Sequence, residues 1–264
     1  MTQPKWWDAT IKAESVDLNE LMNVLDKECD RYVIGKETGA DGYKHYQIRM
    51  VCKVPKEMST VHNMLQRNNP NCQGWVTPTS KEGRNFNYCE KEGDFIRSWE
   101  KALRSWATIE LKDWQAQLKE IWKYQNEREV DVLFDPVGNI GKTVFAKHMV
   151  ATHSATYVPP IGDAQDLMAF ALEKPAKAYI FDMPRSESVK QKKGMWSAIE
   201  QIKNGYLYDK RYKFRDAWID PPRVLVMCNE LPEMDSLSSD RWRFYEVKQW
   251  GRESLLLPYT PPSE

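Results

Sequence analysis

The stretch Asp131–Val150, DVLFDPVGNIGKTVFAKHMV, decides how the rest of the chain is interpreted. It opens with the apolar run Val132–Phe134, turns through Pro136 and Gly138, and reaches Gly141–Thr143 where a helix should begin. A strand, a glycine turn and a helix in this order are typical of a phosphate-binding loop. The glycines let backbone N–H groups face a phosphate, and the start of the helix adds partial positive charge. The alternative is an ordinary turn before a helix.

The second half of this stretch fits the nucleotide-binding pattern. Lys142 is expected to reach the β- and γ-phosphates of ATP, and the Thr143 hydroxyl is expected to hold Mg²⁺. The usual pattern starts with a glycine where this chain has Pro136. The strand before the loop and the GKT sequence after it favour ATP binding. The residues expected to contact ATP are Gly138, Asn139, Ile140, Gly141, Lys142 and Thr143.

Composition limits the possible partners. The formal net charge of the 264-residue chain is zero, so DNA binding would have to come from local patches. The 11 Trp and 12 Tyr residues could pack in the core or stack on bases. The five cysteines form no C-x-x-C pair, which argues against a zinc site or a disulfide framework. No apolar run approaches the length of a membrane-spanning helix, so no membrane partner is expected.

The first hundred residues predict a small α+β domain. Strands are expected at residues 6–12, 31–37, 43–54 and 74–77, with a Gly-rich turn between the second and third. One helix should begin after Asp17, whose side chain can cap it. A second helix should be capped by Ser59 or Thr60, and a third should run from residue 80 to about 92 and end at Gly93.

A first candidate site lies on the strand at residues 43–54. Residues two apart on a strand point to one face, so His45 and Gln47 can present a nitrogen and an oxygen together. Glu37, on the neighbouring hairpin strand, could add a carboxylate. Such a set suits Mg²⁺ or Mn²⁺ better than zinc. The alternative is a surface strand on which His and Gln face solvent.

A second candidate pair is Tyr88 and Lys91, which share a face if residues 80–92 are helical. A tyrosine hydroxyl is a poor nucleophile near neutral pH because its pKa is about 10. A nearby ammonium and a metal-polarised phosphate would help it attack phosphorus. The alternative is an amphipathic helix with a buried Tyr and a solvated Lys.

Between residues 99 and 127 the chain has an apolar stripe at helical spacing that includes Trp114, Leu118 and Trp122. Two interpretations are open. The segment is either a helix that packs in a core or a small collar that holds subunits in a ring.

Two further strands follow the phosphate-binding loop. KAYIFD, residues 177–182, ends in Asp182, which is expected to bind Mg²⁺ of the ATP site. The residues after it, Met183–Arg185, offer no second acid to activate water, and Glu187 is a candidate for that role. RVLVMCN, residues 223–229, reads as a buried parallel strand that places Asn229 near the γ-phosphate. Arg241 or Arg243 could act in trans on the ATP of a neighbouring subunit.

The segment KNGYLYDKRYKFR, residues 203–215, interleaves cations with aromatic rings. Cations suit phosphates and rings suit bases, which favours contact with single-stranded DNA. An amphipathic hairpin with one packed face is the alternative. The expected DNA contacts are Lys203, Lys210, Arg211, Tyr212 and Lys213.

The order of these motifs resembles a known family. A strand at residues 7–12, then E-x(7)-H-x-Q, then Y-x-x-K resembles the three motifs of the HUH endonuclease domain of rolling-circle replication initiator (Rep) proteins. The phosphate-binding loop, FDMPR, K-x-G-Y, MCNELP and S-x-D-R follow the order of a superfamily 3 helicase. Together they look most like the Rep proteins of nanoviruses, alphasatellites and smacoviruses. The resemblance implies metal ligands at Glu37, His45 and Gln47, a nucleophile at Tyr88 and a helper at Lys91.

The resemblance also implies an organisation and a function. We expect an HUH endonuclease domain at residues 1–98, a helical linker or oligomerisation segment at 99–127, an α/β ATPase with a mainly parallel sheet at 128–250, and a tail at 251–264. Residues 256–264 of the tail are Pro-rich and are expected to be loose. The expected activity is nicking and rejoining of single-stranded origin DNA through a 5′-phosphotyrosine, with ATP-driven unwinding by a homo-oligomeric, hexameric ring.

The expected cofactors are Mg²⁺ or Mn²⁺ and ATP. The expected partners are single-stranded DNA, an origin stem-loop and the host DNA polymerase machinery, in the host nucleus or, in a prokaryotic host, the cytoplasm. Two other functions remain open. One is an origin-binding initiator or repressor without nuclease activity, and the other is an ATP-driven packaging or remodelling motor.

Overall fold

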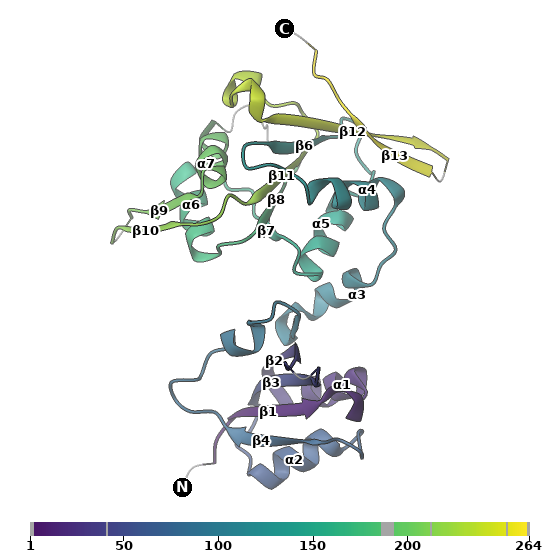
Figure 1. Cartoon of the computed structure of the whole chain (residues 1–264), viewed down its shortest axis with the longest axis vertical. Coiled ribbons are helices and arrows are strands. Elements are labelled where there is room, and N and C mark those ends of the chain that lie inside the picture. Colours follow the sequence, from purple (N-terminus) through teal and green to yellow (C-terminus); the bar gives the residue numbers. More distant parts are fainter. Residues whose placement is uncertain (1–2, 41, 186–192, 212, 252, 263–264) are drawn as a thin grey trace. The chain divides into compact units, whose positions relative to one another are not determined.

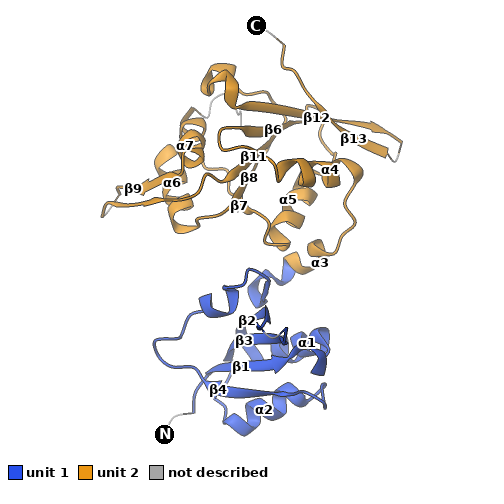
Figure 2. Ribbon diagram, in the orientation of Figure 1, with its two compact units in different colours: residues 1–102 blue, residues 103–264 orange. Residues whose placement is uncertain are grey.

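Two units, residues 1–102 and residues 103–264, divide the chain in the computed structural model (Figure 1 and Figure 2). The structure describes residues 3–40, 42–185, 193–211, 213–251 and 253–262. The first unit contains an antiparallel sheet and the second a mixed sheet of mainly parallel strands. The predicted order of an α+β unit followed by a unit with a mainly parallel sheet is confirmed at this level.

The sheet of the first unit has five strands in the order β4-β1-β3-β2-β5, and each neighbouring pair is antiparallel. Its strands are β1 (Trp6–Lys12), β2 (Cys29–Thr38), β3 (Lys44–Cys52), β4 (Gly74–Pro78) and β5 (Phe95–Arg97). Its helices are η1 (Ala13–Ser15), α1 (Leu18–Glu28), α2 (Met58–Gln66) and η2 (Asn87–Glu90). The four strands predicted from alternating residues are therefore present.

The two faces of this sheet have different characters. On β1, Trp7, Ala9 and Ile11 are buried in a core that α1 and α2 cover. Asp8 and Thr10 alternate with them and so point to the opposite face. Packing on one side thus leaves the other face of the sheet for polar side chains.

Of the helix predictions for this unit, one helix cap is confirmed, and a second cap and one helix are wrong. Asp17 caps α1 as expected, because its Oδ1 accepts the N–H groups of Asn19 at 2.8 Å and Glu20 at 3.0 Å. The cap predicted for α2 is wrong, since the helix begins at Met58 after Glu57, without a side-chain cap. The helix predicted for residues 80–92 is also wrong, because only the short 3₁₀-helix η2 forms there.

The second unit has a six-stranded sheet in the order β13-β12-β6-β11-β8-β7. All neighbours are parallel except β12 and β13. The strands are β6 (Val130–Phe134), β7 (Thr156–Val158), β8 (Ala178–Asp182), β11 (Arg223–Cys228), β12 (Trp242–Trp250) and β13 (Glu253–Pro258), with a separate hairpin of β9 (Tyr206–Asp209) and β10 (Arg215–Trp218).

Helices cover both faces of the second sheet (Figure 1). The helices are η3 (Ser98–Leu103), which starts in the first unit, α3 (Arg104–Ala107), α4 (Asp113–Trp122), α5 (Lys142–Ala151), α6 (Ala164–Glu173), α7 (Lys193–Lys203), η4 (Met234–Ser236) and η5 (Ser239–Arg241). On β11, Val224 and Val226 pack in the core of α6 and α7, whereas Leu225 and Met227 pack in the core of α4 and α5. The near-continuous apolar sequence of β11 is explained by this burial on both faces.

Two segments differ from the sequence expectations. The helical region at 99–126 is divided into η3, α3 and α4, and Trp114, Leu118 and Trp122 on α4 are fully buried beside α5. Its apolar stripe is therefore used for packing within the second unit. The expectation of a loose segment at 256–264 is wrong for residues 256–258, because they belong to β13 (Glu253–Pro258), which pairs with β12 and buries Leu256.

Candidate functional site

The polar face of the first sheet brings together side chains from several strands. Strand register pairs Thr10 with Gln47, and Glu37 with His45. Directly opposed residues on neighbouring strands point to the same face. His45 and Gln47 line one cavity of about 440 Å³ together with Tyr88. The structure therefore brings together the three predicted motifs of this unit.

Glu37 lies at the centre of this group. Its Oε2 is 3.5 Å from Nε2 of His45 and 2.9 Å from Nζ of Lys91. The side chain is 8% exposed, and among the described residues its Oε1 is buried without a hydrogen-bond partner. The hydrogen bond that Lys91 donates to Glu37 raises the pKa of Lys91 above its ordinary value. A buried carboxylate oxygen without a donor is a free ligand for a cation.

Gln47 and Thr10 form the next part of the site. The Thr10 hydroxyl donates to Oε1 of Gln47 at 2.8 Å, and both side chains are buried. Sequence reasoning missed Thr10, because its role depends on the register between two strands that lie 37 residues apart. The bond leaves the second lone pair of the amide oxygen for another partner.

These residues fit a hard divalent cation. Glu37 offers a carboxylate oxygen, Gln47 an amide oxygen and His45 an imidazole nitrogen, which Mg²⁺ and Mn²⁺ accept. Within the described ranges, no group of three or more His, Cys, Asp or Glu residues is placed to hold a metal. A metal here would therefore need Gln47 as its third ligand.

Tyr88 is half exposed on η2 and lies above this face. Nζ of Lys91 is 4.3 Å from the centre of its ring. The pair stays together although the predicted helix is absent, because residues i and i+3 also align on a 3₁₀ turn. A Cβ atom on Gly35 would lie 2.2 Å from the carbonyl oxygen of Cys89. Only glycine at this position on β2 therefore lets η2 approach the sheet so closely.

A buried ion pair holds the loop that precedes η2. Arg49 on β3 binds both carboxylate oxygens of Asp8 on β1, at 2.6 and 2.9 Å. Its remaining nitrogen donates to the carbonyl oxygens of Gly83 at 2.5 Å and Asn85 at 2.7 Å. These bonds satisfy loop carbonyls that a helix would have used internally. Arg49, paired with Asp8, thus holds Gly83 and Asn85 of this non-helical segment, and sequence reasoning missed both Arg49 and Asp8.

In the second unit, β6 leads through the glycine loop into α5, as predicted. A cavity of about 610 Å³ opens at this loop. Gly138, Asn139, Gly141, Lys142 and Thr143 line it, and so do Asp182 and Asn229. The side chain of Ile140 instead packs in the core beside α4, so only its backbone is available to a ligand.

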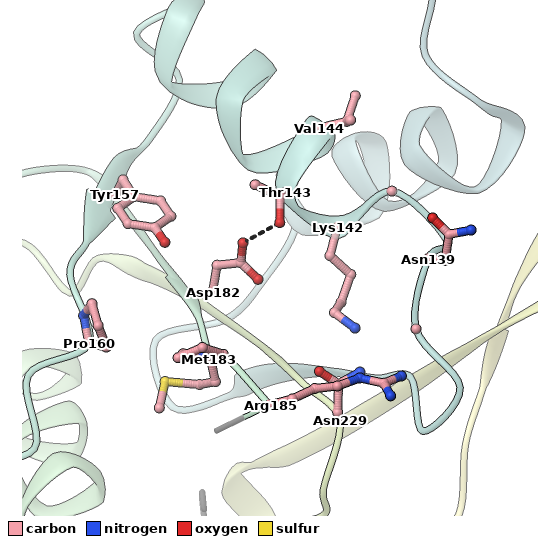
Figure 3. Close-up of a pocket in the computed structure, with 13 residues that line it drawn as sticks. Asn139, Lys142, Thr143, Val144, Tyr157, Pro160, Asp182, Met183, Arg185 and Asn229 are labelled. Carbon is pink, nitrogen blue, oxygen red and sulfur yellow. Dashed lines mark hydrogen bonds between the residues drawn. The ribbon is translucent and has the colours of Figure 1, made fainter. Parts of the chain in front are cut away.

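A carboxylate and a hydroxyl, the two groups that the sequence predicts as Mg²⁺ ligands, lie side by side in this cavity. The Thr143 hydroxyl donates to Oδ2 of Asp182 at 2.8 Å, as the dashed line in Figure 3 shows. Burial raises the pKa of Asp182, while the Thr143 bond and the charge of Lys142 act in the opposite direction. A hydroxyl beside a carboxylate is the arrangement that holds Mg²⁺ at ATP sites.

Lys142 is held by a residue that sequence reasoning missed. Its Nζ is 2.7 Å from Oδ2 of Asp135, and both side chains are buried. Oδ1 of the same carboxylate accepts the N–H of Gly138 at 2.7 Å. The amide of Asn229 donates to the backbone carbonyl of Asp135 at 2.5 Å. Asp135 therefore joins the loop, its lysine and β11 in one network.

Arg185 and Tyr157 also line the cavity and were not predicted as site residues. Nη2 of Arg185 donates to the carbonyl oxygens of Val137 and Pro136 on the loop. Arg185 and Asn229 line the same cavity, and Figure 3 shows the arginine on the side toward which Lys142 extends. Its place directly after the Asp182 strand was the available signal. The proposed water-activating residue Glu187 lies outside the described residues.

The two candidate arginine fingers are engaged within the unit. Arg241 is 3% exposed, and its Nη2 donates to Oδ1 of Asn204 at 2.9 Å. Arg243 forms a two-pronged bond to the fully buried Asp131 on β6, at 2.5 and 2.9 Å. Neither guanidinium is offered to a neighbouring subunit in this conformation.

The predicted DNA-contacting residues divide into different environments. Lys203 is 1% exposed, and its Nζ donates to the carbonyl oxygens of Asn126 at 2.9 Å and Pro222 at 3.0 Å. Burial lowers the pKa of Lys203 to about 8. This lysine is therefore a structural residue and is removed from the DNA-contact set. Arg211 pairs with Asp209 and Asp166.

Two of the remaining residues of that set, Lys210 and Lys213, lie at the tip of the β9–β10 hairpin. Lys210 and Lys213 are exposed, and Tyr212 lies outside the described residues. A row of rings runs along the hairpin, in which Tyr206 lies 4.8 Å from Trp218 and Tyr208 stacks on Phe214 at 6.5 Å. The hairpin thus presents aromatic rings as well as the two lysines.

Comparisons with known proteins identify relatives of this chain. No family model matches it. It is 32% identical over 136 residues to Para-Rep C6 of Subterranean clover stunt C6 alphasatellite, which covers 50% of this chain and 46% of that protein. It is 32% identical to the master replication protein of Faba bean necrotic yellows virus and 30% identical to that of Banana bunchy top virus. Each of these two matches spans 141 residues, 53% of this chain and 47% of the relative.

The matched part spans about half the length of these curated relatives. Over that part, the chain is a homologue of viral replication proteins. Its relatives are those of nanoviruses and alphasatellites, so the resemblance seen in its motifs is confirmed. Among the residues that the structure describes, no helix has the length and apolar character that crossing a membrane requires.

Proposed function

We propose that this protein initiates rolling-circle replication by nicking and rejoining single-stranded origin DNA. The observation that carries the proposal is the meeting of Tyr88, His45 and Gln47 around one cavity, with Glu37 and Lys91 in contact beside it. These residues come from β2, β3 and the segment of η2, so the fold gathers them from separate parts of the chain. The names of the homologues, master replication protein and Para-Rep, support the same role.

The chemistry follows from the order of these groups. The Tyr88 hydroxyl gives up its proton and its oxygen attacks phosphorus, so a new P–O bond forms. The bond from phosphorus to the 3′ oxygen breaks, and that oxygen takes up one proton and leaves as a 3′-hydroxyl. A bound Mg²⁺ or Mn²⁺ would supply polarisation of the phosphate. One phosphodiester replaces another, so attack by a 3′-hydroxyl on the phosphotyrosine rejoins the strand.

Lys91 has two contacts that matter for this step. Its Nζ binds the same Glu37 oxygen that faces His45, and it lies beside the Tyr88 ring. A divalent cation on Oε1 of Glu37 would place a second positive charge beside the ammonium of Lys91 and would weaken its bond to Oε2. The ammonium could then stabilise the tyrosinate or the phosphate charge.

For the second unit we propose ATP hydrolysis that drives unwinding. Lys142 would bind the β- and γ-phosphates, and Thr143 and Asp182 would hold Mg²⁺. Arg185 lies at the cavity and can supply in cis the positive charge that the sequence assigned to Arg241 or Arg243 in trans.

We also propose the partners that this activity needs. They are an origin stem-loop, a host polymerase that extends the 3′-hydroxyl, and further copies of the chain in a hexameric ring, with the host nucleus as location. The hexamer and the location rest on the family resemblance alone.

The nicking proposal is tested by a covalent adduct. The full chain is incubated with Mn²⁺ and a pool of randomised single-stranded oligonucleotides that carry a 3′ fluorophore. The fluorophore should then migrate with the protein on a denaturing gel, because the 5′ phosphate of the labelled fragment stays on tyrosine. Tyr88→Phe should abolish this band. Tyr124→Phe, which changes an 81% exposed tyrosine of the second unit, should retain it.

Absence of the band with wild type, or its survival in Tyr88→Phe, rejects the nuclease. The ATPase is tested separately, because Lys142→Ala should abolish ATP hydrolysis and retain the adduct. Hydrolysis that persists in Lys142→Ala rejects the assignment of the phosphate-binding loop.

A further inference from the structure

The first turn of α4 binds the backbone of the phosphate-binding loop. Nε2 of Gln115 donates to the carbonyl oxygen of Gly141 at 3.0 Å. Nζ of Lys112 at 3.1 Å and the indole N–H of Trp114 at 3.3 Å both donate to the carbonyl oxygen of Ile140. Three donors from one helix end therefore hold two successive carbonyl groups of the loop.

The amide of Gln115 is fixed at both ends. Its Oε1 accepts the backbone N–H of Lys112 at 2.9 Å, while its Nε2 faces the carbonyl of Gly141. The side chain is 1% exposed, so water does not compete for these bonds. Because one partner is a donor and the other an acceptor, only one orientation of the amide satisfies both.

These bonds set the direction of the loop's N–H groups. In a planar trans peptide the C=O and the following N–H point in opposite directions. With the carbonyls of Ile140 and Gly141 held toward α4, the N–H groups of Gly141 and Lys142 point away from α4. Gly141 and Lys142 both line the ATP cavity. A phosphate at the start of α5 is recognised by such N–H groups.

The backbone conformation and the surroundings of Gly141 both favour glycine at this position. Its φ of 105° lies in the left-handed region, and a Cβ there would lie 3.2 Å from Nε2 of Gln115. Two donors hold the peptide that follows Gly141, because its carbonyl oxygen accepts the backbone N–H of Phe145 in α5 at 3.1 Å and Nε2 of Gln115 at 3.0 Å. Gln115 is the donor that comes from outside the loop and α5.

We propose that Gln115 is a positioning residue for nucleotide binding, acting through the Gly141 peptide rather than by touching the nucleotide. The inference rests on the proposed ATP site and adds to it a residue outside the loop, on the helix that was expected to serve as linker or collar. Loss of the bond should weaken binding of ATP in ground state and transition state alike, which raises KM and leaves kcat nearly unchanged.

The same helix offers a matched control. Gln117, two residues further on, accepts the N–H of Leu256 on β13 with its Oε1 at 3.0 Å. This hydrogen bond holds α4 to β13 and does not involve the phosphate-binding loop. A purely structural role for glutamines on α4 would give both positions the same phenotype.

The test uses the full chain and measures the Kd of a fluorescent ATP analogue with Mg²⁺, the KM and kcat of ATP hydrolysis, and Tm. Gln115→Glu keeps the acceptor for Lys112 and loses only the donor to Gly141, and Gln115→Met loses both. Gln117→Glu adds the same charge to the same helix, and Gln117→Met removes the bond to β13.

Both Gln115 variants should raise Kd and KM about tenfold with kcat within about twofold of wild type. Gln117→Met should lower Tm only, and Gln117→Glu should bind as wild type does. Wild-type KM in both Gln115 variants overturns the inference, as does an equal rise in KM for the Gln117 variants. A wild-type chain that binds no nucleotide rejects the ATP site itself, which is a different outcome.

Discussion

Replacing Asp135 by Asn should tighten the binding of ATP, although Asp135 lies inside the phosphate-binding loop. In the structure its carboxylate holds Nζ of Lys142 at 2.7 Å. In the proposed ATP site, the lysine would have to turn to the phosphates. The carboxylate would then compete with the nucleotide for the same ammonium group.

The size of the effect follows from the burial of the pair. The two side chains are 9% and 5% exposed. At this distance, with an effective dielectric constant of about 20, the attraction is roughly 6 kcal/mol before desolvation. Removing one partner of a buried pair costs about 3–5 kcal/mol. Asn can keep one oxygen for the N–H of Gly138. We therefore expect the Asp135→Asn variant to lose about 3 kcal/mol of its free energy of unfolding in the absence of nucleotide.

Binding of ATP restores a partner to Lys142 in the Asp135→Asn variant. If half of the loss is recovered, the affinity for ATP rises by about 1.5 kcal/mol, which is slightly more than a tenfold decrease in Kd. Thermal unfolding should show a lower Tm than wild type without nucleotide and a larger increase in Tm when Mg²⁺ and ATP are added.

Titration calorimetry of the wild type, Asp135→Asn, Lys142→Ala and the double variant gives the coupling between the two residues. In the Lys142→Ala background, Asp135→Asn should no longer tighten binding. The reasoning is refuted if Asp135→Asn weakens ATP binding, because the carboxylate would then serve the bound state. It is also refuted if the change is the same without Lys142.

Three further variants test other parts of the structure. Gly35→Ala should lower the stability of the first unit by about 1–3 kcal/mol and slow adduct formation by displacing η2, since its Cβ would lie 2.2 Å from the Cys89 carbonyl oxygen; an adduct rate equal to wild type contradicts this. His45→Ala should abolish the adduct and keep ATP hydrolysis within about twofold, and loss of both would show that the activities are not separable. Burial lowers the folded-state pKa of Lys203 to about 8, so the charged amine destabilises the fold below that pH and the penalty fades as pH rises toward 10.5. Relative to Lys203→Met, the free energy of unfolding of the wild type, measured in urea, should therefore rise by at most about 3 kcal/mol between about pH 8 and 10.5. A difference between the two proteins that does not change with pH would contradict the buried charge.

Local patterns were enough to predict the parts of the sites that depend on neighbours in the chain. A strand, a glycine turn and a helix start specify where Lys142 and Thr143 lie, because all three elements fall within about twenty residues. Alternation on β3 places His45 and Gln47 on one face, because side chains repeat every two residues on a strand. The pair Tyr88 and Lys91 stayed together although the helix assigned to it does not form, since both helix types align residues three apart.

Local sequence patterns gave wrong predictions where a contact between residues far apart in the chain determines the structure. Lys203 follows the cation-and-ring composition of a DNA contact, yet backbone carbonyls from positions 77 and 19 residues away bind its amine inside the second unit. Residues 80–86 have helical composition, yet Arg49 takes their carbonyls. Neither contact leaves a trace in local periodicity, because it depends on how the sheet and the loops pack.

The sequence by itself determined the candidate groups: a loop with the phosphate-binding pattern, a strand with metal-type donors, a tyrosine beside a lysine, and the order of motifs that resembles viral replication proteins. Only the tertiary structure decided which contacts these groups make. Asp135 restrains Lys142, Gln115 holds the loop from another helix, and Gly35 lets η2 approach the sheet. The reason is physical. The sequence gives the residue types directly, whereas the packing of the folded chain sets the distances between side chains that are far apart in the sequence.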